Sequence, residues 1–501
     1  SGGSINGQLD LAADNPQALL TALDQADLGE VTQSINLKAA VRGNRADLKI
    51  NPLDLTVVLS GDKIPNSHVN LGLNADTRVN LDKETLALEN FKLTGLGLNM
   101  SGKINASSIL QSPEFNGDIN IAEFSLRKFM QQLNQEMPVT ADTKVYEKVS
   151  LATTFDGAAN RINVSKLALV LDDTNMNGTL SVTDFDKPAV QFGINIDQIN
   201  ADRYLPPPQA DGQNRPVTPE TAAGAAAQLP VETLRSLNAK GDLKIGQLVI
   251  SKAKMSDIVL SLDAKDGRIN LAPVAANLYA GTYSGDIGLD ATAALPVVNF
   301  KSTLQGVKIE PLMTDFTGAA NVSGIGDIEM SVTATGADST ALKRSLSGNG
   351  KIALKEGVLR GVDVAKVLEQ VEIMIESKRP MDIDRGVETP FDTFTSTLEI
   401  NNGVVASNEL MIKAPGLQVA GKGTVINLVN GTLDYTLIAS ADASSVTRGT
   451  ERYNVGGYTV PIRCNGLVNS PKCVPDAGEI IKFAVQKAVE KKLSDVLQRA
   501  I

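Results

Sequence analysis

The stretch TLALENFKLTGLGLNMSGKI, residues 85–104, shows the pattern that decides the fold. Apolar side chains occur at alternate positions along its extended runs, with polar residues or glycine between most of them. Successive side chains of a β-strand point to opposite faces, so this alternation gives each strand one apolar and one polar face. The apolar set is Leu86, Leu88, Phe91, Leu93, Leu96, Leu98 and Met100.

The same alternation recurs along the chain from about residue 34 onward. It is clear in the segments 34–43, 161–173, 241–250 and 432–441. Turn residues separate such segments at intervals of about 8 to 12 residues, which predicts dozens of consecutive antiparallel strands. The composition agrees, because the 501 residues include 42 glycines, 4% aromatic residues and no tryptophan. We therefore expect a mainly β fold.

Helical signals are few, and most of them are short. Three segments have the pattern of a short amphipathic helix, at 15–25, 124–135 and 230–238. Two longer amphipathic patterns cover 361–379 and 477–501. We expect the first of these to line or plug a groove and the second to cap the last strand edge. Contact with a membrane surface is the alternative role for the second.

Four passages repeat one motif, a strand that ends in a polar turn and is followed by a short amphipathic segment. The unit varies, which indicates a degenerate internal repeat rather than a strict solenoid period. The passages are 7–23, 117–133, 193–207 and 304–318.

One segment, residues 206–230, is rich in proline, alanine, glutamine and glycine and has no periodicity. Such a composition predicts an exposed, flexible insert. It divides the chain into N-terminal strand repeats at 1–205 and a C-terminal β region at 231–476, which the amphipathic segment 477–501 follows.

The sequence offers little chemistry for catalysis or for binding metals. His68 is the single histidine, and its turn-like setting favours a solvated side chain over the general base of a catalytic triad. One histidine far from two cysteines does not supply the clustered ligands that a zinc site requires. The net charge of -10 comes with no basic stripe, which argues against nucleic acid as a partner. We therefore expect no enzyme, no cofactor and no metal.

Two segments imitate ligand-binding motifs but lack parts of them. GLQVAGKG at 416–423 has Gly423 where a phosphate-binding loop needs serine or threonine, and a strand pattern follows where a helix should begin. DIDRG at 382–386 has two carboxylates without the other oxygen ligands of a calcium loop. We interpret both segments as ordinary turns.

The two cysteines lie near the C-terminal end in RCNGLVNSPKC, residues 463–473. A redox couple normally has two residues between its cysteines, whereas the turn signals NG and SP between Cys464 and Cys473 favour a cross-linked hairpin. A disulfide that closes so short a loop contributes about 2 to 3 kcal/mol of stability when unstrained. It also indicates an oxidising compartment. Two buried free thiols are the alternative.

Several motifs follow a pattern known from one protein family. They are DAKDGRINLAPVAANLYAGTYSGDIGLDA at 263–291, LKRSLSGNGKIALKEGVLRGVDVAKVL at 342–368, DRYLPP at 202–207 and VPIRCNGLVNSPKCVPD at 460–476. Through them the chain resembles the bacterial AsmA family over about 190–476, whereas residues 1–190 share only its texture of strands and short helices. The cysteines depart from the family pattern, which has apolar or small residues at those positions.

The resemblance implies a periplasmic protein of bacteria with two membranes, anchored in the inner membrane by an N-terminal helix that this sequence lacks. The family is similar to the repeating-β-groove bridge proteins. This similarity implies a long, twisted, curled antiparallel sheet whose apolar groove passes phospholipids between inner and outer membranes, with envelope proteins as further partners. A non-enzymatic scaffold that assists the assembly of outer-membrane proteins is the alternative function.

A sheet of so many strands is not expected to stay flat, because twist accumulates and open sheets beyond about ten strands curl or split. The residues alone favour a sandwich or a closed barrel over an open groove, and the resemblance reverses that preference. Alternation does not show which face is concave. On the groove hypothesis the lining residues are Leu86, Leu88, Leu98, Met100, Leu398, Ile400, Leu433, Tyr435 and Leu437.

Overall fold

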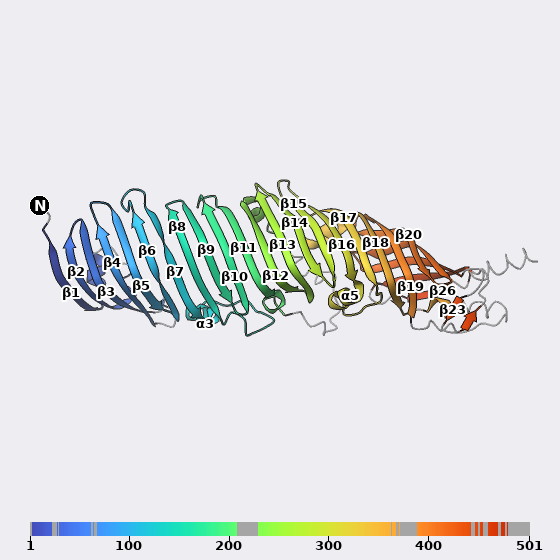
Figure 1. Ribbon diagram of the computed structural model, residues 1–501, viewed down its shortest axis with the longest axis horizontal. Coiled ribbons are helices and arrows are strands. Elements are labelled where there is room, and N and C mark those ends of the chain that lie inside the picture. The colour runs from blue at the N-terminus through green and yellow to red at the C-terminus, as the bar shows by residue number, and fades with distance from the viewer. Residues whose placement is uncertain are drawn as a thin grey trace, which may run out of the picture. The chain divides into compact units, whose positions relative to one another are not determined.

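The structure is a computed structural model in which, among the described residues, strands dominate and helices are short (Figure 1). The sheet formed by these residues contains 24 strands, which confirms the prediction of a mainly β, antiparallel fold. The described residues are 3–22, 28, 30–61, 64, 68–207, 229–361, 363–366, 370, 388–441, 446–448, 451–453, 459–468, 472–475 and 478.

The chain divides into two compact units, which are described separately. Unit 1 comprises residues 1–213 and 237–250, and unit 2 comprises residues 214–236 and 251–501. The expected insert 206–230 and the expected helices 361–379 and 477–501 lie largely outside the described residues. Their roles and the domain boundaries drawn from them therefore stay predictions.

Unit 1 is a row of twelve strands in chain order, with short helical segments between some of them (Figure 1). Each strand pairs antiparallel with the next, except that β11 and β12 are parallel. The elements are β1 (Ile5–Asp14), α1 (Gln17–Ala22), β2 (Thr32–Asn44), β3 (Asp47–Ser60), β4 (His68–Asn80), β5 (Thr85–Gly95), β6 (Leu98–Ser107), β7 (Glu114–Phe124), α3 (Leu126–Gln132), β8 (Val149–Ala158), β9 (Arg161–Leu171), β10 (Thr174–Thr183), β11 (Ala189–Asn200), η2 (Ala201–Arg203) and β12 (Ala239–Ile250).

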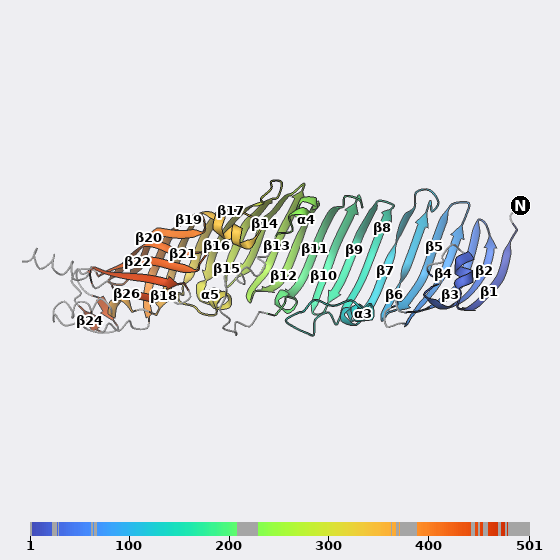
Figure 2. The same ribbon diagram turned by 180° about the vertical axis from the view of Figure 1, so that it is seen from behind.

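Unit 2 continues with antiparallel strands in chain order, and Figure 2 shows its helices α4 and α5 at opposite edges of these strands. The short strands β23 (Val446–Arg448) and β24 (Glu451–Tyr453) form a separate hairpin. The other elements are α4 (Val231–Ser236), β13 (Ala253–Lys265), β14 (Arg268–Leu278), β15 (Gly281–Asp290), β16 (Val297–Lys308), α5 (Ile309–Thr317), β17 (Ile325–Thr335), α6 (Ser339–Ser345), β18 (Ser347–Arg360), β19 (Glu388–Asn401), β20 (Val404–Ala414), β21 (Leu417–Asn427), β22 (Thr432–Ala441), β25 (Thr459–Leu467) and β26 (Lys472–Pro475).

The stretch 85–104 forms β5, a two-residue turn and most of β6. Leu96 and Gly97 occupy the turn with φ angles of 52° and 76°, and positive φ at both central residues is typical of the tight turns of β-hairpins. The expectation that Leu96 belongs to the apolar alternation is therefore wrong, because the turn removes it from the strand. A bulge at Asn90 also shifts the alternation between Leu88 and Phe91.

The four repeated passages each place a short helical segment after a strand. In unit 1 these segments are α1, α3 and η2, which follow β1, β7 and β11. Six antiparallel strands separate α1 from α3 and four separate α3 from η2, so all three lie at the same edge of the unit's sheet. In unit 2, α5 repeats the arrangement after β16.

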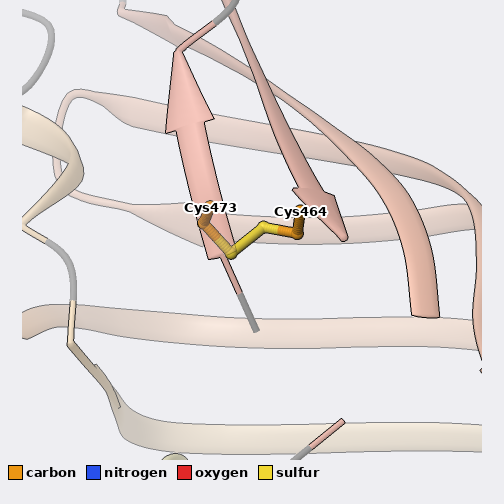
Figure 3. The surroundings of a disulfide bond; sticks show 2 residues. All are labelled: Cys464 and Cys473. Carbon is orange, nitrogen blue, oxygen red and sulfur yellow. A yellow bond between two sulfur atoms is a disulfide. The ribbon is translucent and has the colours of Figure 1, made fainter. Parts of the chain in front are cut away.

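The two cysteines form a disulfide that links β25 to β26, as Figure 3 shows. The S–S distance is 2.07 Å, and Cys464 and Cys473 are direct partners in the antiparallel pairing of the two strands. Cys464 is buried within the apolar cluster of unit 2. The bond therefore joins the last described strand pair to the core.

Glycine permits two close contacts between neighbouring strands of unit 1. A Cβ atom on Gly117 of β7 would lie 2.1 Å from the carbonyl oxygen of Lys103 on β6, and one on Gly178 would lie 2.1 Å from the oxygen of Gly193. Real side chains do not tolerate such distances, so the close approach of the neighbouring strand at these positions requires glycine.

A cluster of ionic and hydrogen-bonding groups, here called the Asp172 cluster, fixes the chain where β11 ends. The Asp172 carboxylate accepts hydrogen bonds from the Tyr204 hydroxyl at 2.9 Å and from the backbone N–H groups of Tyr146, Glu147 and Lys148 at 2.8, 3.0 and 3.2 Å. Arg203 donates to Asp142 at 2.9 Å and to Asp173 at 2.7 Å.

The cluster explains part of the DRYLPP motif, because Arg203 and Tyr204 tie η2 to the segment before β8 and to the turn after β9. Burial acts to raise the pKa of Asp172, but the hydrogen bonds that its carboxylate accepts outweigh burial and lower the pKa overall. Burial and the bond to Asp172 raise the pKa of Tyr204.

We predict that Gly117→Ala lowers the free energy of unfolding of unit 1 by about 1 to 3 kcal/mol, because the new methyl group collides with the backbone of β6. Gly193→Ala is the matched control, since its Cβ would meet only the Thr179 hydroxyl at 3.5 Å. Thermal unfolding followed by circular dichroism measures both variants. Equal unfolding midpoints for the two would contradict the close approach at Gly117.

We predict that Asp172→Asn destabilises unit 1 at neutral pH and that its deficit relative to the wild type shrinks in acid. The folded pKa of Asp172 is lowered, so its contribution is complete above the unfolded value of about 3.9 and is lost as pH falls through the folded pKa. Urea unfolding at pH 7 and below pH 4 tests this prediction. The exposed Asp186→Asn serves as control, and a deficit that is independent of pH would refute the assigned role.

Candidate functional site

The pairing of strands in unit 1 aligns apolar side chains into an unbroken line across the sheet. Residues paired directly across neighbouring strands share a face, so the register identifies one such line with a member on every strand from β1 to β12. We call it the central apolar row. It consists of Leu11, Leu37, Leu55, Leu73, Leu93, Met100, Ile121, Leu151, Leu169, Met176, Ile196 and Ile245.

The opposite face of the same strands is polar. One residue away from the central apolar row, the register aligns a second line of twelve residues, which we call the polar row. Ten of them are polar or charged and two are alanine, so the two faces have different chemistry across the whole unit. The polar row consists of Asp10, Lys38, Asp54, Asn74, Lys92, Ser101, Asn120, Ala152, Ala168, Asn177, Asn195 and Lys244.

The central apolar row is only partly removed from solvent. Ile245 is buried, Leu93 is exposed at 39%, and the other ten members are half-buried. A sheet face that packs against a second layer is normally buried. The exposures instead describe an apolar surface that stays accessible along its length, with each strand shielded mainly by its neighbours.

The apolar face of unit 2 is more enclosed toward its C-terminal end. There the paired residues Ile412, Val419, Ala439 and Val460 on β20, β21, β22 and β25 are 0 to 3% exposed. They belong to one cluster of buried side chains that also draws on α5, β18 and β19. The face therefore changes from an accessible surface in unit 1 to a packed core at this end of unit 2.

The residues expected to line a groove fall into these two environments. Leu86, Leu88, Leu98 and Met100 lie on the accessible apolar face of unit 1, and all four are half-buried. Contact between any of the nine residues and a lipid stays a prediction. In unit 2, Leu398, Ile400 and Tyr435 are buried, whereas Leu433 and Leu437 are half-buried beside the cluster.

The sequence did not predict most members of the central apolar row, although each lies in an alternating segment. Alternation identifies the apolar side of one strand but does not show which residue on the next strand stands opposite. That pairing depends on bulges, such as those between Leu88 and Phe91 and between Gly178 and Leu180.

Polar residues line several surface hollows of the described chain. One hollow in unit 1, of about 530 Å³, is lined mainly by polar-face residues such as Asp47, Arg78, Asn105 and Asn116. The ion pair between Arg463 and Asp434 borders a hollow of about 470 Å³ in unit 2. Within the described residues, no cluster of three potential metal ligands occurs.

In the part of the chain that the structure describes, no helix combines the length and the apolar character needed to cross a membrane.

Comparison with known proteins agrees with the motifs. The chain is 20% identical to Protein AsmA of Escherichia coli (strain K12) over 392 residues, which is 75% of this chain and 63% of that protein. The chain thus spans somewhat less than two thirds of this relative's length. The model of the AsmA family matches residues 25–410, which include all of β2 to β19. By this match over most of its length, the chain belongs to the AsmA family.

Proposed function

We propose that this chain is a non-enzymatic lipid transfer protein that passes phospholipid between the inner and outer bacterial membranes along its apolar face. The central apolar row is the observation that carries the proposal. Each of its twelve members is Leu, Ile or Met, and eleven of them are half-buried or exposed.

Exposed apolar surface of this extent needs a partner. Monomeric soluble proteins rarely leave contiguous apolar patches larger than a few hundred Å² in water, and larger patches mark interaction sites. Acyl chains laid along the row would remove apolar area from water at about 25 cal/mol per Å². The partner with the matching chemistry is therefore a long, flexible hydrocarbon.

The length of the row favours an extended path for lipids over a pocket for a single lipid. Neighbouring strands lie about 4.8 Å apart, so twelve strands carry the row over roughly 50 Å. The hydrocarbon core of a whole bilayer is about 30 Å thick, and one acyl chain spans only half of it. A single lipid would thus occupy a fraction of the row and could move from one position to the next.

The similar side chains of the row favour movement of a lipid along it. Its members have similar size and polarity, so a chain sliding along them exchanges equivalent contacts and meets no charged or strongly hydrogen-bonding group on the way. Direction and driving force would come from outside this face.

Location in the periplasm is part of the proposal. The disulfide between Cys464 and Cys473 supports it, because such bonds persist in oxidising compartments. Membership of the AsmA family supports a role in the bacterial envelope, and the relative in Escherichia coli belongs to an organism with two membranes.

A scaffold for assembling outer-membrane proteins is the second candidate function. An exposed strand edge can accept an added strand, which is how a scaffold of this fold would hold a partner. Cross-linking from β1 to outer-membrane proteins, without lipid on the apolar face, would favour this function.

We predict that gently purified protein contains phospholipid and that Met100→Glu reduces the amount. The introduced carboxylate would lie between Leu93 and Ile121 in the central apolar row, where a hydrocarbon partner would have to desolvate it. Mass spectrometry of extracted lipid, normalised to protein, provides the measurement.

The matched control is Ser101→Glu, the next residue on β6. Its carboxylate would lie on the polar face between Lys92 and Asn120, so the lipid content should equal that of the wild type. Circular dichroism establishes that both variants fold. Lipid-free wild-type protein, or equal lipid loss in both variants, would count against a lipid path on the apolar face.

A further inference from the structure

Three hydroxyl groups interrupt the apolar face of unit 2 at one place. The Oγ atoms of Ser396 on β19 and Ser407 on β20 lie 2.8 Å apart, and both side chains are buried, at 5% and 1% exposure. Tyr435 on β22 is 7% exposed, and its hydroxyl interacts with the Ser407 side chain without reaching the geometry of a hydrogen bond to any described residue. These three residues form the hydroxyl cluster.

The backbone around the hydroxyl cluster is shaped to admit the tyrosine ring. The register pairs Ser407 with Gly423 and Gly423 with Tyr435, so a glycine separates the two hydroxyl-bearing strands. A Cβ atom on Gly421 would lie 2.6 Å from Cε1 and 3.0 Å from the hydroxyl oxygen of Tyr435. Glycine at this position therefore leaves the space in which the ring lies across β21.

Three irregularities of register flank the hydroxyl cluster. The pairing of β19 with β20 shifts between Thr395 and Glu399, and the pairing of β20 with β21 shifts on both sides of Ser407, between residues 405 and 406 and between residues 407 and 410. Bulges re-aim side chains and are frequent beside functional sites. Here they accompany hydroxyl groups set among two apolar clusters, since Leu398, Ile400 and Val405 form one buried group and Tyr435 belongs to the larger one.

A buried hydroxyl without a well-formed hydrogen bond lowers the stability of the folded state. Burial of a polar group without a hydrogen bond is unfavourable, and a specific unsatisfied group in a folded protein calls for an explanation such as a ligand. Phenylalanine would fill the same space without that cost. Burial raises the pKa of Tyr435, with the nearby Ser407 hydroxyl acting in the opposite direction, so the phenol remains a proton donor near neutral pH.

We propose that the hydroxyl cluster is a polar subsite in which Tyr435 donates a hydrogen bond to the carbonyl oxygen at the head of an acyl chain. The proposal rests on the proposed lipid function and adds a position at which a lipid pauses. Leu433 and Leu437, the neighbours of Tyr435 on the same face of β22, are half-buried. They provide apolar contacts for the chain that follows the carbonyl.

The carbonyl has two chemical sources, the ester of a diacyl phospholipid and the carboxylate of a free fatty acid. Both offer a carbonyl oxygen next to a hydrocarbon chain, whereas a dialkyl ether phospholipid with the same headgroup and chains offers only ether oxygens, which are weaker acceptors. Comparison of these three molecules therefore separates the contribution of the carbonyl oxygen from the hydrophobic contact.

The experiment uses a local reporter in the full chain. Leu437→p-benzoylphenylalanine places a photo-reactive group beside Tyr435, and the protein is irradiated with an equimolar mixture of diacyl phospholipid, dialkyl phospholipid and fatty acid. Mass spectrometry of the cross-linked peptide should show a several-fold preference for one of the two carbonyl-bearing molecules over the ether lipid, and the preferred molecule identifies the source. Addition of Tyr435→Phe should reduce that preference to parity.

Two controls make the result specific. Tyr283→Phe removes another tyrosine hydroxyl from the apolar face of unit 2 and should leave the preference unchanged. The same photo-reactive group at Leu98, on the accessible face of unit 1, should capture ester and ether lipids equally.

The outcomes separate this inference from the proposed function. Capture of lipid at both positions without any preference at position 437, or a preference that survives Tyr435→Phe, would overturn the subsite and leave the lipid path intact. No lipid capture at either position would overturn both. The unfolding midpoint of lipid-free Tyr435→Phe should equal or exceed that of the wild type, and a lower midpoint would show that the hydroxyl serves folding instead.

Discussion

The constraint on which the structure depends is the cross-strand register. A slip of one residue in any pairing would exchange the two faces of that strand, yet in unit 1 the central apolar row continues from Leu11 to Ile245 through twelve strands. Bulges shift several ladders without breaking the row. The chain thus keeps one chemistry on each face even though many ladders are irregular.

This constraint also explains why the chain needs so little catalytic chemistry for the proposed role. A single layer of sheet with one apolar face left accessible can be covered by hydrocarbon instead of by a second layer of protein. In unit 2 the same kind of face closes into a packed cluster around Val419, Ala439 and Val460. An acyl chain would move along the accessible segment of the face. Where the face is packed, the chain would stop or be held.

Much of the fold could be predicted from the sequence, because period-two alternation is a local property. It predicted the strands, and the short helices α1, α3 and α4 formed within their expected segments. Leu96 was misplaced because its alternation continues through a turn whose positive φ angles depend on the pairing around it. The parallel pairing of β11 with β12 depends on a long connection that local pattern does not describe.

The site was less predictable than the fold. Alternation identified the apolar side of individual strands but not the central apolar row. Which residues stand opposite each other depends on bulges, and these bulges lie far from any recognisable motif. The hydroxyl cluster could not be predicted for the same reason. Ser396, Ser407 and Tyr435 look like ordinary strand residues; the two serines meet between β19 and β20, and the register through Gly423 aligns Ser407 with Tyr435.

The most direct test of the lipid path is a scan of photo-reactive side chains along the central apolar row and the polar row of unit 1, in protein purified from cells. Lipid adducts are expected at positions of the central apolar row on strands from β1 to β12 and none at the adjacent positions of the polar row. Adducts confined to a few neighbouring strands would indicate a pocket, and adducts on both rows or on neither would contradict the account.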